Sequence, residues 1–199
     1  MSVSDILFAP PTPFHGASDD AEAELIKRLL RAERSAVAEV YDEHHAAVRA
    51  FARRLVGEPA AAEDLVHEVF VSLPKAAKNF RGQSSLRTFL ISIAVNHARH
   101  HVRAAARRRS AFNKLEQEPI GEVQDPEKVT ERKQLAQALT RALDTLPLDQ
   151  RVAFVLCEIE ERTSVDAARI ADVPEGTMRT RLFHAKKKLR AELEKEGFR

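Results

Sequence analysis

The clearest structural pattern in this chain of 199 residues lies in Thr163–Leu189, which reads TSVDAARIADVPEGTMRTRLFHAKKKL. Thr163 or Ser164 can cap a short helix, and Asp166 completes a start that resembles a capping box. A tight turn at residues 172–174 follows, and a long helix is expected directly after it. Two helices joined by a short turn are typical of a helix-turn-helix, whose second helix enters the major groove of DNA.

The second helix of this segment has two different faces. Apolar residues recur at three- and four-residue spacing between Met178 and Leu193, as expected for a side that packs on a core. The opposite side carries cations around an aromatic ring, which favours contact with base edges and methyl groups. An amphipathic surface helix with an ordinary lysine run is the alternative interpretation. The residues predicted to bind DNA here are Arg179, Thr180, Phe183, His184 and Lys187.

The remainder of the chain also has a helical composition, with six glycines and almost no alternating β-branched segments. Ser35 is expected to cap a helix that stops at Gly57, and Pro74 is expected to kink or end the next one. We expect an all-α protein of two small helical domains joined by a flexible linker. The expected division is a disordered N-terminal tail (1–20), a first domain (21–109), an acidic linker (110–127) and a second domain (128–199).

The distribution of charge is more informative than the total. The formal net charge is only +2, but residues 95–109 and 177–191 contain several cations and no acid, while acids gather between residues 116 and 127. Two separate basic faces predict two contacts with a polyanion. The single Cys157 excludes an internal disulfide. The chain contains no apolar run of about 20 residues, the length that would predict a membrane-spanning helix. The first 20 residues lack a signal-peptide pattern, so a cytoplasmic location is expected.

A second candidate site begins in the loop at residues 79–85, which combines amides, hydroxyls, a cation and an aromatic ring. The helix after this loop places polar and cationic residues on one face. Such a groove suits single-stranded nucleic acid, because cations follow the backbone while a base is held outside the stack. For Phe80, packing into the core is the favoured interpretation. The candidate residues for this contact are Asn79, Arg81, Ser84, Asn96, Arg99 and Arg103.

Enzymatic and metal sites are not predicted. His97 and His101 lie one helical turn apart and could supply two metal ligands, but no third ligand is identifiable. No phosphate-binding glycine loop and no nucleophile–base arrangement is present. We therefore expect no enzyme activity, no cofactor and no metal.

Several segments resemble the extracytoplasmic-function (ECF) group of bacterial RNA polymerase sigma factors. Residues 62–70 (AEDLVHEVF), 80–85 (FRGQSS) and 89–96 (FLISIAVN) are similar to sigma region 2. Residues 176–182 (GTMRTRL), with Leu146-Pro147, Arg151 and Ala168, are similar to sigma region 4. The resemblance runs in the expected order over residues 23–194, so it is far more specific than an isolated helix-turn-helix.

The resemblance implies a transcription initiation factor that directs core RNA polymerase to particular promoters. Region 4 would bind the −35 duplex and the polymerase flap, region 2 the melted −10 strand, and an anti-sigma factor would be a further partner. The alternatives are a helix-turn-helix regulator that binds duplex DNA without polymerase, and a DNA recombinase or nuclease. The residues that the resemblance assigns to the polymerase clamp coiled coil are Asp64, Leu65, Glu68 and Val69.

Overall fold

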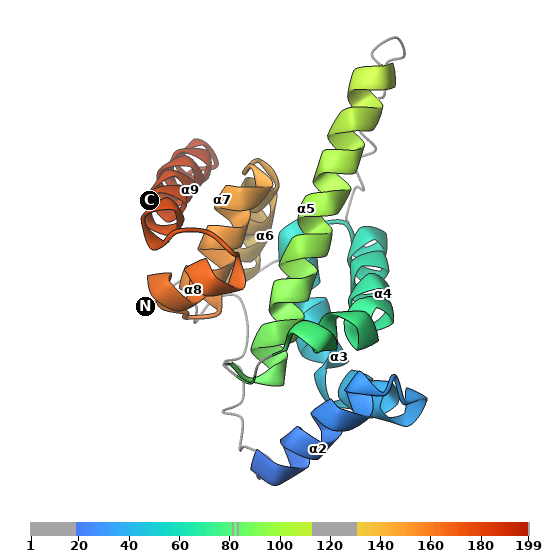
Figure 1. The fold of residues 1–199 in the computed structure, drawn as a ribbon. Coiled ribbons are helices and arrows are strands. Elements are labelled where there is room, and N and C mark those ends of the chain that lie inside the picture. The colour runs from blue at the N-terminus through green and yellow to red at the C-terminus, as the bar shows by residue number, and fades with distance from the viewer. Residues whose placement is uncertain (1–18, 81, 83, 113–130, 199) are drawn as a thin grey trace.

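The computed structural model describes residues 19–80, 82, 84–112 and 131–198, and within them it contains helices and no strand (Figure 1). The predicted all-α class is confirmed for this part of the chain. Residues 1–18 of the predicted tail and 113–127 of the predicted linker lie outside it, whereas Asp19 and Asp20, predicted to be disordered, form the start of a helix. The first helical half consists of α2 (Asp19–Leu30), α3 (Arg34–Val56), α4 (Pro59–Ala76), the 3₁₀ turn η1 (Ala77–Asn79) and α5 (Leu86–Phe112). The second helical half consists of α6 (Glu131–Asp144), α7 (Leu148–Phe154), the π-helical turn η2 (Val155–Ile159), α8 (Ser164–Ile170) and α9 (Glu175–Lys195).

Local capping chemistry explains several helix ends. Thr163 caps α8, since its hydroxyl accepts a hydrogen bond from the Asp166 N–H at 3.1 Å. Gly57 ends α3 with a φ of 73°, a positive value that glycine adopts without the steric cost of a Cβ atom. The prediction for Ser35 is wrong, because Glu33 occupies the N-cap position and Ser35 lies inside α3. Its hydroxyl instead accepts a hydrogen bond from Arg28 at 3.1 Å.

Pro74 does not stop α4 at its own position, and the helix continues to Ala76. A proline removes one backbone donor and crowds the carbonyl four residues earlier, so at this position it disturbs only the last turns of α4. The chain then tightens into η1, whose end is marked by a hydrogen bond from the Phe80 N–H to the Ala77 carbonyl at 2.9 Å. Pro74 therefore precedes the end of the helix by two residues.

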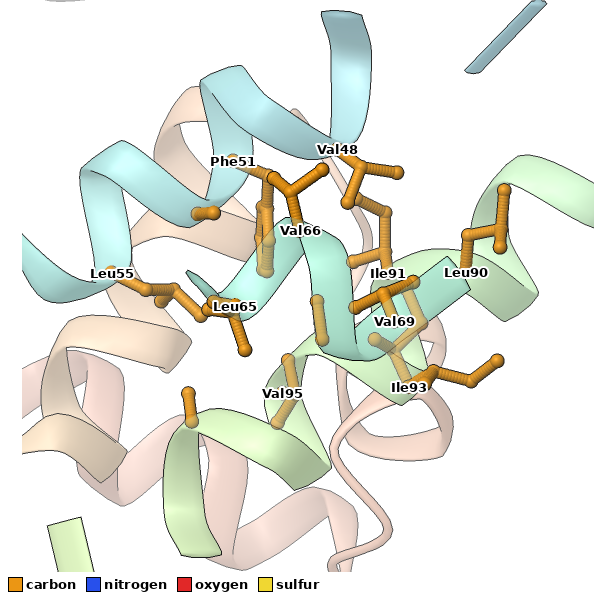
Figure 2. Close-up of a cluster of buried hydrophobic side chains, with 14 of the residues drawn as sticks. Val48, Phe51, Leu55, Leu65, Val66, Val69, Leu90, Ile91, Ile93 and Val95 are labelled. Carbon is orange, nitrogen blue, oxygen red and sulfur yellow. The ribbon is translucent and has the colours of Figure 1, made fainter. Parts of the chain in front are cut away.

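The core of the first helical half forms where α3, α4 and α5 meet. Figure 2 shows their apolar side chains turned toward one another. Each helix contributes residues three or four positions apart, as expected when one stripe of a helix is buried. Burying each large aliphatic or aromatic side chain stabilises the fold by about 1.5–3 kcal/mol. The labelled members of this core are Val48, Phe51, Leu55, Leu65, Val66, Val69, Leu90, Ile91, Ile93 and Val95.

The two helical halves pack directly against each other. Helix α3 contacts α6, α7 and η2, while α5 contacts α7 and α8. Figure 1 shows α5 beside α7 and α8. One continuous cluster of buried apolar residues joins the core of the first helical half to Val152, Leu156, Ala171 and Met178 of the second. A smaller cluster between α6, α7 and α9 includes Leu143 and Leu189. Apolar burial therefore crosses the boundary between the halves.

Arg151 is the most deeply buried cation at this boundary, with 8% of its surface exposed. Its Nη1 donates to the Leu55 carbonyl at 2.8 Å and to Asp144 Oδ1 at 2.9 Å. Burial lowers the pKa of Arg151, and the nearby Asp144 carboxylate opposes that effect. Gly57 lies beside the same carboxylate, because a Cβ atom on Gly57 would stand 2.4 Å from Asp144 Oδ1.

Replacing Phe51 with alanine tests the core of the first helical half. Phe51 has no exposed surface, so we expect Phe51→Ala to lower the free energy of unfolding by about 3–5 kcal/mol. Urea denaturation followed by circular dichroism measures this change. Val71→Ala is the control, because Val71 lies on α4 with 66% of its surface exposed and should change stability by no more than about 0.5 kcal/mol. Equal losses in the two variants would contradict this assignment of the core.

Candidate nucleic-acid interface

Helix α9 presents a continuous exposed face on the side away from its core contacts. Met178, Ala185 and Leu189 are buried and fix the rotation of the helix. Phe183 projects outward with 64% of its surface exposed, and its ring meets His184 edge-on at a centroid distance of 5.5 Å. The structure thus brings all the predicted duplex-binding residues to one accessible surface: Arg179, Thr180, Phe183, His184 and Lys187.

The turn before α9 sets the direction of this face. Asp172 adopts a left-handed conformation, and the Val173 N–H donates to the Ala168 carbonyl at 3.0 Å, which reverses the chain after α8. Arg179 Nη2 bonds Glu175 Oε1 at 2.5 Å along the exposed surface. An exposed pair of this kind contributes little stability, so the guanidinium can exchange its partner for a base edge or a phosphate.

The residues predicted to bind the single strand are divided between exposed and covered positions. Asn79, Ser84 and Asn96 are exposed around the start of α5 and along it. Arg81 lies outside the described residues, as does the side chain of Arg103, whose backbone belongs to α5.

Arg99 differs from these exposed residues, because the second helical half covers it. Its side chain is 14% exposed. Its Nε donates to Asp149 Oδ1 at 3.1 Å, and its Nη1 donates to the Ala171 carbonyl at 2.5 Å. Asp149 also accepts a hydrogen bond from Arg181 of α9 at 2.8 Å. No local pattern around either residue indicates this pairing, since Arg99 and Asp149 are 50 positions apart.

Phe80 and Phe89 pack together beside the predicted single-strand groove, with ring centroids 4.9 Å apart. Both rings are half-buried, and Phe89 packs on the main apolar cluster. This contact supports the core-packing interpretation of Phe80. The ring pair anchors the loop to the first turn of α5, where the Ser85 hydroxyl accepts a hydrogen bond from the Thr88 N–H at 3.2 Å.

The structure corrects part of the predicted polymerase contact on α4. Leu65 and Val69 are buried in the core, so their side chains are not available to a partner. Asp64 is exposed, as predicted for a contact residue. His67 and Val71 are also exposed, and both follow Asp64 at helical spacing. Counting this spacing outward from Asp64 would have selected them in place of the two buried residues.

Glu68, the remaining predicted contact on α4, is turned toward α5 by two histidines. Its Oε2 lies 2.7 Å from His101 Nε2 and 3.1 Å from His97 Nδ1. His97 Nε2 also lies 2.9 Å from the Ser72 hydroxyl. Burial lowers the pKa of His97, while the Glu68 carboxylate opposes that effect and the neighbouring His100 and His101 add to it.

Two family models match the chain. The model for sigma-70 region 2 matches residues 40–108, and the model for sigma-70 region 4 matches residues 136–189. The ECF RNA polymerase sigma-E factor of Escherichia coli K12 is 34% identical over 131 residues, which are 62% of this chain and 69% of that protein. The RNA polymerase sigma-H factor of Pseudomonas aeruginosa is 26% identical over 177 residues, 85% of this chain and 92% of that protein. The chain belongs to the ECF group of RNA polymerase sigma factors.

Two solved structures share its fold. The sigma factor RpoE of Bartonella quintana, crystallised with the anti-sigma factor NepR, superposes with a TM-score of 0.60 at 24% identity, covering 88% of this chain and 97% of that chain. CnrH in complex with the cytosolic domain of CnrY gives a TM-score of 0.57 at 22% identity, covering 88% and 98%. Among the described residues, no helix is both long and apolar enough to span a membrane.

The lowered pKa of His97 predicts how stability depends on pH. The unfolded chain binds a proton at this histidine near its ordinary pKa of about 6.5, whereas the folded chain binds it only at lower pH. Stability is therefore expected to fall as the pH drops below about 6.5. We expect His97→Gln to reduce this loss in urea unfolding measured at about pH 7.5 and about pH 5.5. The control is His184→Gln at an exposed site. An unchanged pH dependence in His97→Gln would contradict the assignment.

Proposed function

We propose that this sigma factor binds core RNA polymerase and directs it to promoters through two DNA contacts. The second helical half would bind the −35 duplex through α9, and the first would bind the melted −10 strand through the loop at 79–85 and α5. We assign residues 21–109 to region 2, 128–199 to region 4 and 110–127 to the linker. The protein would act in the cytoplasm and supply no catalytic step, because RNA synthesis belongs to the polymerase.

The observation that carries this proposal is the exposed face of α9. An aromatic ring with most of its surface exposed lies among Arg179, His184 and Lys187, and this combination of apolar and cationic groups suits contact with a nucleic acid. A DNA major groove suits this face, since it offers guanine acceptors to arginine and thymine methyl groups to phenylalanine. Lys187 would contact a phosphate and thereby position the helix.

The −10 contact is proposed for Asn79, Ser84 and Asn96, which are exposed, together with Arg81, Arg99 and Arg103. Amides and hydroxyls can hydrogen-bond the edges of a base held out of the stack, and arginines can follow the backbone. Arg99 can take part only after its bonds to Asp149 and Ala171 are released.

The polymerase contact is proposed for the exposed face of α4, with Asp64 as its charged residue and His67 and Val71 beside it. The clamp coiled coil is the expected target in region 2, and the flap in region 4. An anti-sigma factor is a further expected partner. Support comes from the two fold relatives, both of which were solved in complex with a partner: RpoE with NepR, and CnrH with the cytosolic domain of CnrY.

In vitro transcription tests the whole proposal. The purified chain is added to core polymerase on a pool of promoter fragments, and the RNA 5′ ends are sequenced. We expect new, promoter-specific start sites only when both components are present. A helix-turn-helix regulator that works without replacing sigma would instead bind duplex DNA tightly alone and leave core polymerase without specific starts. That result would contradict the proposal.

Arg179→Ala tests the −35 contact. Loss of one base contact is expected to weaken −35-dependent initiation by about 1–3 kcal/mol. The readout is the apparent affinity of the polymerase–sigma complex for promoter fragments with intact or altered −35 sequences. Arg190→Ala is the matched control, because Arg190 is also exposed on α9 but lies three turns further along. If Arg179→Ala discriminates −35 sequences as well as the control does, Arg179 is not a base contact.

Asp64→Ala tests the polymerase contact. The side chain of Asp64 is exposed, so we expect weaker binding to core polymerase and an unchanged thermal unfolding curve. Fluorescence anisotropy of the labelled chain titrated with core polymerase measures the binding. Asp42→Ala, at an exposed acid on α3, is the control. Equal affinities of the two variants for core polymerase would remove Asp64 from the interface.

A further inference from the structure

The boundary between the helical halves contains ion pairs as well as apolar contacts. Glu160, directly after η2, carries the most buried carboxylate among these ion pairs, with 7% of its side chain exposed. It accepts a bond from Arg54 Nη1 of α3 at 2.6 Å and another from Arg87 Nη2 of α5 at 3.0 Å. Burial lowers the pKa of Arg54, and Glu160 opposes that effect. One acid of the second helical half thus neutralises two cations of the first.

Asp149 makes a second bridge of the same kind. Its two oxygens accept hydrogen bonds from Arg99 of α5 and Arg181 of α9, at 3.1 Å and 2.8 Å. A carboxylate held by two arginines occupies the position that a phosphate would take on a cationic surface. The Ala171 carbonyl holds the other side of the Arg99 guanidinium.

We propose that Glu160 and Asp149 form an acidic latch that holds the free protein closed, so that Arg99 is withheld from DNA until the helical halves separate. The closed state is autoinhibited, since region 2 cannot use its covered face while the second helical half packs on it. The functional consequence rests on the proposed promoter binding, whereas the closed state itself is a property of the free chain.

The latch is suited to release by a polyanion. Arg99 Nη2 and Arg181 Nη1 are buried without a hydrogen-bond partner within the described residues. A buried polar group without a partner destabilises the state that buries it. Phosphates offer more acceptor oxygens than the single Asp149 carboxylate, so exchange from Asp149 to DNA would satisfy donors that the closed state leaves unused.

Small-angle X-ray scattering of the full-length chain, without DNA or polymerase, tests the closed state. Glu160→Gln removes the charge that pairs with Arg54 and Arg87, so these cations should regain water by separation of the halves. We expect the radius of gyration to exceed that of the unsubstituted chain by about 3–5 Å, the scale for two domains of this size moving apart.

Glu158→Gln is the matched control, because it removes the same charge two positions earlier in the same turn. Glu158 pairs with Lys186 of α9, within the second helical half, at 2.8 Å. The radius of gyration of Glu158→Gln should equal that of the unsubstituted chain. Circular dichroism checks that each variant retains its helices.

The functional arm measures the apparent affinity of the free chain for a single-stranded promoter fragment, because the closed state covers Arg99, and the yield of specific transcripts at limiting sigma. If one tenth of the free protein is open, complete opening raises the apparent affinity about tenfold. We expect this gain for Glu160→Gln and not for Glu158→Gln. Absence of specific transcripts with every variant would refute the promoter-binding proposal alone, because the scattering result still decides whether the latch exists.

Asp149→Asn keeps the latch testable if Glu160→Gln fails to fold. Asp149 is 43% exposed, so its neutralisation leaves less unpaired charge in the interior. We expect expansion in this variant as well. The proposal is overturned if folded Glu160→Gln has the same radius of gyration as the unsubstituted chain. If only Asp149→Asn folds, an unchanged radius of gyration in that variant overturns it.

Discussion

The packing of α5 against α3 and α4 is the interaction on which the rest of the structure depends. Leu90, Ala94 and Val95 fix the rotation of α5 by burial, and that rotation decides which way every other side chain of the helix points. Asn96 is consequently exposed, while Arg99 meets the second helical half. The same apolar contact therefore places one polar residue toward solvent and one cation toward Asp149.

Helix class and the exposed face of α9 could be predicted from the sequence because both depend on local patterns. The spacing from Met178 to Leu193 selected the correct buried side of α9, and Thr163 and Gly57 marked real helix ends. The error at Ser35 has a physical cause. Several positions near a helix start can act as the cap, and neighbouring side chains such as Arg28 decide which one does.

The contacts between the halves could not be predicted in the same way. Glu160 and Arg54 are 106 positions apart, and nothing in the residues around either indicates the other. The resemblance assigned Leu65 and Val69 to a partner surface as members of a motif, although helical spacing places them on the buried side of α4. A motif identifies a segment, whereas periodicity identifies which of its side chains reach the surface.

Gly57 shows how the boundary restricts substitution at a site that resembles an ordinary helix end. Asparagine is the usual alternative to glycine after a helix, because it adopts a positive φ more readily than other residues with a side chain. Its Cβ would nevertheless collide with Asp144 and force that carboxylate away from Arg151. Two unrelated requirements, backbone conformation and free volume, thus converge on a single position. A residue that meets the first requirement would still separate Asp144 from Arg151, so fewer residues are compatible with this site than helix capping alone would allow.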